Sequence, residues 1–378
     1  MIKSIVNTQN RILSQIDHQS SGVLDNIVDI SDPIEQLLLY CYYYLENNKI
    51  KKTENTLNTL SKEIPKMKDF QYSVYRLFLA EYLLILHNIQ DSLDILEEID
   101  ETILSARWKA YRYFVLFKIN CFHYKDESSV DLINSAINLS SIDGGLIKLT
   151  KYTHVKAKFY HSIYDIELAK KLYIEAARNY LRIQLFDNAA MVFNDLACAY
   201  RFLGLLKEAK RYHSIGLEYS TKNYCTGIIF NELSKTSLLL NEINFAHTYI
   251  TGSVYYLKTE NLFAYANVLN QYAVVEVHLD NIEHAITLLL DSLQIKQGYK
   301  FKDTARTKAM IGFLRIYNNE IEIAKEYLEQ ALNLYEQDHN KSQIKRINHI
   351  MSIYLVENNK LEKEELLVFL DHFLPCYF

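Results

Sequence analysis

The segment from Leu196 to Ser220 has the spacing of one complete helix–turn–helix unit. Gly204 stands where the first helix must turn, since glycine readily adopts the left-handed backbone that ends helices. Ala209 opens the second helix, and Gly216 follows seven residues later, where a close helix crossing leaves no room for a large side chain. Such a pair has an apolar face that it cannot bury alone, so it requires stacked neighbours.

The same unit recurs along the chain. The residue that opens each second helix is usually small, and it returns at intervals of 37 to 40 residues. These residues are Thr53, Ser92, Val130, Ala169, Ala209, Ala246, Ala285, Ala324 and Lys363. The sequence therefore predicts nine helix pairs in an all-α, right-handed superhelical solenoid of tetratricopeptide-like units, with a period of about 39 residues.

Composition agrees with a helical array. The 378 residues include only three prolines and nine glycines, the two residue types that most disfavour helix interiors, and 49% of the chain is hydrophobic. No change in composition marks a domain boundary. We predict an N-terminal helical cap over 1–30, degenerate helical repeats over 31–145, and tetratricopeptide repeats with a concave binding groove over 146–378.

Charge and cysteine usage bear on partners and compartment. A net charge of −5 lacks the basic excess typical of nucleic-acid-binding modules. The five cysteines form no CxxC pair, which favours buried free thiols in a reducing compartment. The N-terminus lacks the apolar core of a signal peptide, and the most apolar run, 77–86, is too short to span a bilayer. We expect a cytoplasmic protein without nucleic-acid or membrane partners.

Motifs of self-contained catalysis are absent from the sequence. It contains no phosphate-binding glycine loop, no nucleophile elbow and no zinc-protease motif. His154 and His161 are seven residues apart, whereas a helical metal-binding pair usually comes at four. We therefore expect no catalytic residue, no metal and no cofactor.

A series of asparagines is the main candidate for a binding site. In a tetratricopeptide array the first helices line a concave surface. At the fifth residue of the repeat the last five units carry Asn194, Asn231, Asn270 and Asn348, with Ala309 as the exception. Asparagine is less favourable than alanine inside a helix by about half a kcal/mol. Its amide matches the N–H and C=O groups of an extended peptide, so we predict that these residues hold a short extended peptide by its main chain.

Further polar residues fall at or near neighbouring groove positions. They are Asn267, Lys235, Arg201, Arg306 and Arg315. The cations among them suit a carboxylate or acidic side chain of the ligand. The alternative for the asparagines is that an Asn-rich chain simply tolerates polar groove residues, and the alternative for each cation is ordinary surface charge.

Two segments resemble a known family. The helix near the start of Rap-type response-regulator phosphatases is similar to QLLLYCYYYLENN (36–48), and a late repeat of the same proteins is similar to AKRYHSIGLEYS (209–220). Chain length, wide period and the asparagine series resemble the wider group of Gram-positive intracellular peptide receptors, which includes Rap, NprR, PlcR and the phage arbitrium receptors. The resemblance implies a helical peptide receptor.

The resemblance also implies two functions from which this sequence departs. Rap-type phosphatases carry a glutamine on the early helix to orient the attacking water, whereas 45–48 here reads Leu-Glu-Asn-Asn. Transcription-factor members begin with a helix–turn–helix domain, whereas residues 1–60 here contain no basic recognition helix. The receptor part of the resemblance remains.

We therefore predict a peptide-responsive regulator that controls a partner protein and is not itself an enzyme. One alternative is a Rap-like phosphatase in which Asn48 or Gln36 orients water. The other is a scaffold or inhibitor subunit that uses the tyrosine-rich N-terminal half as an interface. A homodimer is compatible with each hypothesis.

Overall fold

A computed structural model describes residues 32–46, 49–86, 88–122, 129–142, 145–298, 304–337, 340–356 and 359–372. Within these ranges the regular structure is helical, with no strand. The prediction of an all-helical array of tetratricopeptide-like pairs is confirmed, while the exact period stays a prediction. The predicted cap over 1–30 and Asn48 lie outside the described residues. No described helix is both long and apolar enough to cross a bilayer.

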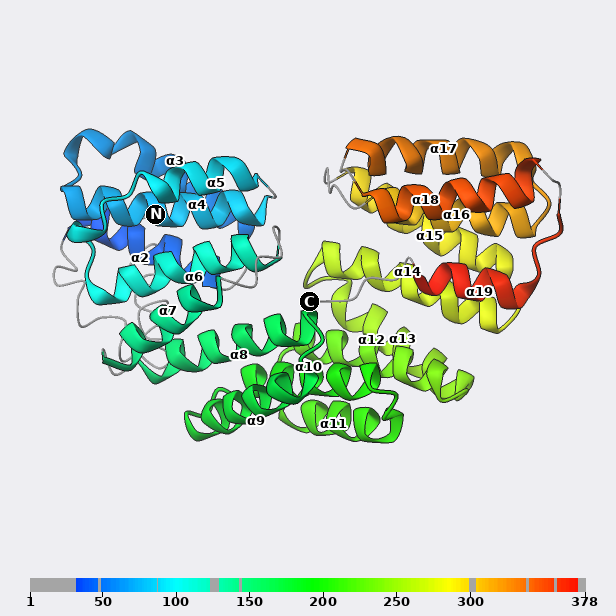
Figure 1. The fold of residues 1–378 in the computed structure, drawn as a ribbon, viewed down its shortest axis with the longest axis horizontal. Helices are drawn as coiled ribbons and strands as arrows, with labels where there is room; N and C mark the ends of the chain where they lie inside the picture. The colour runs from blue at the N-terminus through cyan, green and yellow to red at the C-terminus, as the bar shows by residue number, and fades with distance from the viewer. Residues whose placement is uncertain are drawn as a thin grey trace, which may run out of the picture. The chain divides into compact units, whose positions relative to one another are not determined.

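The chain divides into two compact units, Met1–Leu185 and Phe186–Phe378. The described helices of the first unit (Figure 1) are α2 (Pro33–Glu46), α3 (Ile50–Lys62), η2 (Ile64–Lys66), α4 (Asp69–Ile85), α5 (Ile89–Glu97), η3 (Glu101–Ile103), α6 (Ala106–Phe122), α7 (Val130–Ile142), α8 (Leu146–Ser162) and α9 (Ile166–Arg182). The predicted change of repeat type between 145 and 146 falls inside this unit, and that division stays a prediction.

The second unit continues the alternation of first and second helices. Its described helices are α10 (Phe186–Phe202), α11 (Leu206–Tyr219), α12 (Asn223–Leu239), α13 (Ile243–Leu257), α14 (Leu262–His278), α15 (Ile282–Gly298), α16 (Ala305–Tyr317), α17 (Ile321–Gln337), α18 (Lys341–Met351), the π-helical η5 (Ser352–Val356) and α19 (Lys363–His372). The first helices α10, α12 and α14 are neighbours in turn.

Small residues lie where the two helices of a pair cross. Eight of the nine opening residues predicted from the sequence fall in the first turn of a second helix, whereas Lys363 begins α19, which packs on first helices instead of pairing with α18. Ala209, Ala246 and Ala285 are fully buried there. At Gly216 an added Cβ would lie 3.0 Å from the carbonyl oxygen of Ala190 on the partner helix. Close crossing therefore explains the repeated small residues, as the sequence predicted.

The turn between the helices of a pair has one recurrent form. In five pairs the first helix is followed by a left-handed residue, namely Tyr164, Gly204, Asn241, Asp280 and Asn319. The next residue donates its N–H to a carbonyl five residues earlier, as Leu205 does to Tyr200 at 3.0 Å. This is the Schellman arrangement, which satisfies carbonyls that the helix end leaves unpaired. The same tight turn therefore orients each second helix in the same way.

Candidate ligand-binding surface

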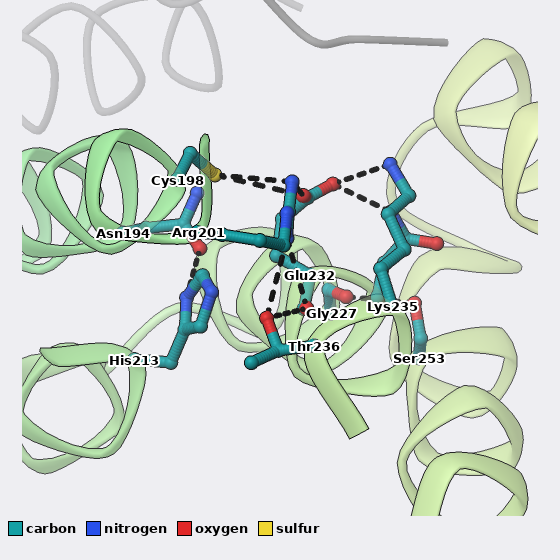
Figure 2. A network of polar contacts seen from close by, with 10 residues as sticks. Asn194, Cys198, Arg201, His213, Gly227, Glu232, Lys235, Thr236 and Ser253 are labelled. Carbon is teal, nitrogen blue, oxygen red and sulfur yellow. Dashed lines mark hydrogen bonds and ion pairs between the residues drawn. The ribbon is translucent and has the colours of Figure 1, made fainter. Parts of the chain in front are cut away.

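A buried carboxylate organises the first helices of the second unit. Glu232 on α12 accepts from Lys235 Nζ at 2.7 Å and from Arg201 Nη2 of α10 at 2.6 Å (Figure 2). Arg201 Nη1 also donates to the main-chain oxygen of Glu232 at 3.2 Å and to Thr236 Oγ1 at 3.3 Å. We call Arg201, Glu232 and Lys235 the charged cluster. It links two neighbouring first helices by charge-assisted hydrogen bonds.

The pKa of Glu232 shows which form of the charged cluster is favoured. Burial by itself raises this pKa, but the charges of Lys235 and Arg201 outweigh burial and hold it well below its usual range. The carboxylate is therefore ionised at neutral pH. A buried charge of this kind is tolerated only because two cations and a backbone-linked network surround it.

Asn194 on α10 lies beside this cluster and is bound within the protein. Its Oδ1 lies 3.0 Å from Nδ1 of His213 on α11, and because the amide oxygen accepts, the ring nitrogen donates (Figure 2). Nε2 of His213 is buried and has no hydrogen-bond partner among the described residues. Burial, together with the charge of Arg201, lowers the pKa of His213 to about 3. The ring is therefore neutral at physiological pH.

Four amide side chains on α12 and α14 form the second part of the site, which we call the amide cluster. They are Asn231, Asn267, Asn270 and Gln271. All four are at most 2% exposed. Asn231 Nδ2 donates to Glu232 Oε1 at 2.9 Å, and Asn270 Nδ2 donates to Thr307 Oγ1 of α16 at 3.0 Å.

The amide cluster has hydrogen-bonding capacity that the described part of the chain does not use. The side-chain oxygens of Asn231, Asn267 and Asn270, and both polar atoms of Gln271, have no partner there. A buried polar atom left without a hydrogen bond costs about 1–3 kcal/mol. Asn267 and Gln271 are four residues apart, so they share one face of α14. This face is therefore the strongest candidate for contact with a polar ligand.

The structure brings some of the predicted site residues together and separates others. Arg201, Lys235 and Asn231 meet at Glu232, and Asn267 and Asn270 share α14. The remaining ones lie on later first helices: Asn348 is exposed on α18, while Arg306 and Arg315 are partly buried on α16, where Arg315 is ion-paired with Glu320. A role for any of them in peptide binding stays a proposal.

Sequence reasoning missed Glu232, Gln271 and His213. A signal was present one residue after the asparagine series, where successive units carry Asp195, Glu232 and Gln271. These three side chains are buried, unlike typical surface charges and amides. His213 had no comparable signal, because the corresponding residue in the next pair is Ile250.

The described residues contain no group of three His, Cys, Asp or Glu side chains placed to hold a metal ion. His154 stacks edge-on against Tyr173 and Tyr180, and His161 is buried with its Nδ1 3.4 Å from the Tyr173 hydroxyl. Both histidines thus take part in packing around one tyrosine.

Comparison with solved structures identifies the type of fold. The apo form of the quorum sensor NprR from B. thuringiensis matches with a TM-score of 0.59 at 16% identity, over 92% of this chain and 100% of that chain. NprR in complex with its cognate peptide NprX matches with a TM-score of 0.54 at 17% identity, over 88% and 100%. Aspartyl phosphate phosphatase F from Bacillus subtilis matches with a TM-score of 0.57 at 12% identity, over 92% and 95%.

The chain has a tetratricopeptide-like helical-repeat fold that resembles the fold of the Rap and NprR proteins. This confirms the resemblance that the two sequence segments suggested. No protein-family model matches the sequence, and no curated protein matches it.

Proposed function

We propose that this protein is a peptide-responsive regulator whose second unit binds a short extended peptide and thereby controls a partner protein. The observation that carries the proposal is the amide cluster of α12 and α14, with its buried unpartnered oxygens. Each amide offers an acceptor and two donors, the complement of a peptide main chain. Binding to main-chain groups would satisfy atoms that the described residues leave without partners.

The charged cluster gives the proposed site its second property. Arg201 and Lys235 flank the amide of Asn231 through their shared partner Glu232. Each cation is already hydrogen-bonded to Glu232, so the cluster holds the amide of Asn231 in place between α10 and α12. The solved complex of NprR with its cognate peptide supports the proposal only by similarity of fold.

The proposal is tested by affinity selection from a random heptapeptide library, read out by mass spectrometry. The wild-type protein is expected to enrich a set of peptides, and the double variant Asn231→Ala, Asn267→Ala is expected to lose at least nine-tenths of that enrichment. The control variant Asn244→Ala, Asn333→Ala removes two amides from exposed positions of second helices and should enrich as wild type does. Equal enrichment by all three proteins would contradict the role of the amide cluster.

A Rap-like phosphatase is the second candidate, because aspartyl phosphate phosphatase F shares the fold. Gln36, one of its two proposed water-orienting residues, is half-buried on α2. Incubation with a phosphorylated receiver domain separates the two functions. Loss of phosphate that is faster than in the receiver alone, and that Gln36→Ala abolishes, would replace the regulator proposal with an enzymatic one.

A further inference from the structure

The last helix does not continue the array of second helices. α19 packs against the first helices α14 and α16, and Figure 1 shows it lying alongside α14. Lys363, at its first residue, is ion-paired with Asp280 at 2.5 Å, and its Nζ lies 3.4 Å from the main-chain oxygen of His278. Both partners stand at the end of α14, more than eighty residues earlier in the chain.

The contact between α19 and the first helices is apolar. Leu361, Leu366 and Leu370 are at most 2% exposed, and they belong to the same hydrophobic cluster as Val274 and Val277 of α14. The ring of Phe369 lies 5.8 Å from that of Phe313 on α16. Burial of these leucine side chains removes apolar area from water, so α19 is held in this position.

The side chains at the ninth and twelfth positions of the repeat explain why α19 docks on α14 and α16 and not on α10 and α12. The ninth residue of the repeat is Lys235 in α12 but Val274 in α14 and Phe313 in α16. The twelfth residue is Arg201 in α10 but Val277 in α14. Each of α10 and α12 therefore carries one cation at these two positions, whereas both positions are apolar in α14, where α19 docks.

The asparagine series is interrupted at the same place. Its fifth-residue position is Ala309 in α16, the helix on which Phe369 packs, and the series resumes only at the exposed Asn348 of α18. The amide cluster thus ends on α14, at the helix where the contacts of α19 begin.

We propose that α19 is the stop that ends the ligand-binding surface and limits the length of the bound peptide. This inference rests on the proposed function. With α19 docked, a peptide would lie along α10, α12 and the amide-bearing face of α14, while α19 would block its path across α16 toward the exposed Asn348. The specificity-determining residues are Leu366, Phe369 and Leu370, which act by covering the apolar first-helix positions.

The distance across α10, α12 and α14 sets the length of the peptide that can bind. Packed helices lie about 8–10 Å apart, so crossing from α10 to α14 covers two such steps, roughly 20 Å. An extended chain advances about 3.3–3.6 Å per residue, which corresponds to roughly six residues. Release of α19 would open α16 and α18 and add a similar distance.

The experiment selects from equimolar random libraries of five, seven, nine and eleven residues, with the Leu366→Asp variant placing a charge in the apolar contact. Val368→Asp is the matched control, because Val368 lies on the same helix and is 53% exposed. Hydrogen exchange is expected to show loss of protection in α19 for Leu366→Asp alone. That variant should retain the eleven-residue peptides at least tenfold better than wild type and Val368→Asp.

Each outcome decides a separate point. An unchanged length distribution in Leu366→Asp, with α19 unprotected, would overturn the stop. Absence of enrichment at every length in wild type and variant would overturn the proposed function instead. Phe369→Ala is the second variant in case a buried charge prevents folding, since it removes a half-buried ring without adding a charge. Like Leu366→Asp, this variant should retain longer peptides better than wild type does. If hydrogen exchange shows that α19 has lost protection and the length distribution is unchanged, the proposed role of α19 is wrong.

Discussion

The two units share one helix-pair construction, but the buried side-chain amides without a partner among the described residues all lie in the second unit. In the first unit Glu81 is paired with Lys118 at 3.1 Å and accepts from the Tyr111 hydroxyl, and Gln71 donates to Asp32 at 2.9 Å. In the second unit the amide cluster keeps several buried oxygens without partners among the described residues. The first arrangement stabilises the unit itself, whereas the second has polar capacity to offer a ligand.

The hydrophobic cores of the two units also differ in the kind of side chain that they bury. The first unit packs Phe78, Trp108 and Tyr111 edge to face, with ring centroids 5.4 to 6.0 Å apart. The second unit buries mainly alanine, valine, isoleucine and leucine around its first helices. Large rings buried in contact give one cohesive aromatic core, whereas small side chains leave room for polar residues between neighbouring first helices.

The largest expected effect tests whether the aromatic core is confined to the first unit. Trp108→Ala should lower the free energy of unfolding by about 3–5 kcal/mol, because it removes a fully packed ring. Hydrogen exchange should show the loss in α4 and α6 and leave α12 and α14 protected. Ile103→Ala, at a 37% exposed position, is the control. Equal loss of protection in α12 would mean that the two units unfold together.

The next effect concerns the charged cluster of the second unit. Glu232→Ala leaves Arg201 and Lys235 without their shared carboxylate, and removal of one partner from a buried ion pair costs about 3 kcal/mol. Urea unfolding measures the change. Glu218→Ala, at an exposed position of α11, should change stability by about 0.5 kcal/mol at most. If Glu232→Ala lowers the free energy of unfolding by no more than Glu218→Ala does, the charged cluster does not stabilise the fold.

His213 predicts a pH dependence of smaller size. The unfolded state binds a proton on this histidine below about pH 6.5, whereas the folded state does so only near pH 3. Stability contributed by the neutral ring is therefore present above pH 6.5 and is lost progressively as the pH falls toward 3. Between pH 7 and pH 5 the loss is about 2 kcal/mol.

The variant His213→Leu isolates this contribution, because other groups that titrate in the window remain in both proteins. Urea unfolding of wild type and variant at pH 7 and pH 5 gives the difference. The variant is expected to lose about 2 kcal/mol less than wild type over this range. The same loss in both proteins would assign the pH dependence to other groups.

The smallest expected change in stability concerns the left-handed turn that recurs in both units. Gly204 has φ of 73° with no atom within 4 Å of an added Cβ, so Gly204→Ala should cost about 1 kcal/mol through the backbone alone. Tyr164 occupies the same turn position in the first unit with φ of 68° and is 71% exposed. Tyr164→Gly relieves the left-handed backbone at this position, so it should cost less in thermal unfolding than Gly204→Ala. A larger loss for Tyr164→Gly would show that the contacts of the tyrosine outweigh the relieved backbone.

Much of the fold was predictable because its signals are local. Ala209, Ala246 and Ala285 mark helix crossings, and Gly204 marks a left-handed turn, each for steric reasons that act within one pair. The asparagine register likewise follows from counting residues along the repeat. Part of the candidate site was predictable in the same way, since Asn231 and Asn270 were expected on first helices and lie there, whereas Glu232 and Gln271 were not predicted.

Tertiary structure decided the pairing and the limits of the site. Arg201 forms an ion pair with Glu232, which lies 31 residues later in the sequence. No pattern in the sequence predicts which cation pairs with a buried carboxylate. α19 has the register of a second helix, yet its leucines pack on α14 and α16. Periodicity determines which face of a helix is apolar, but the partner of that face depends on which long-range contact buries most surface, and only the folded chain settles that.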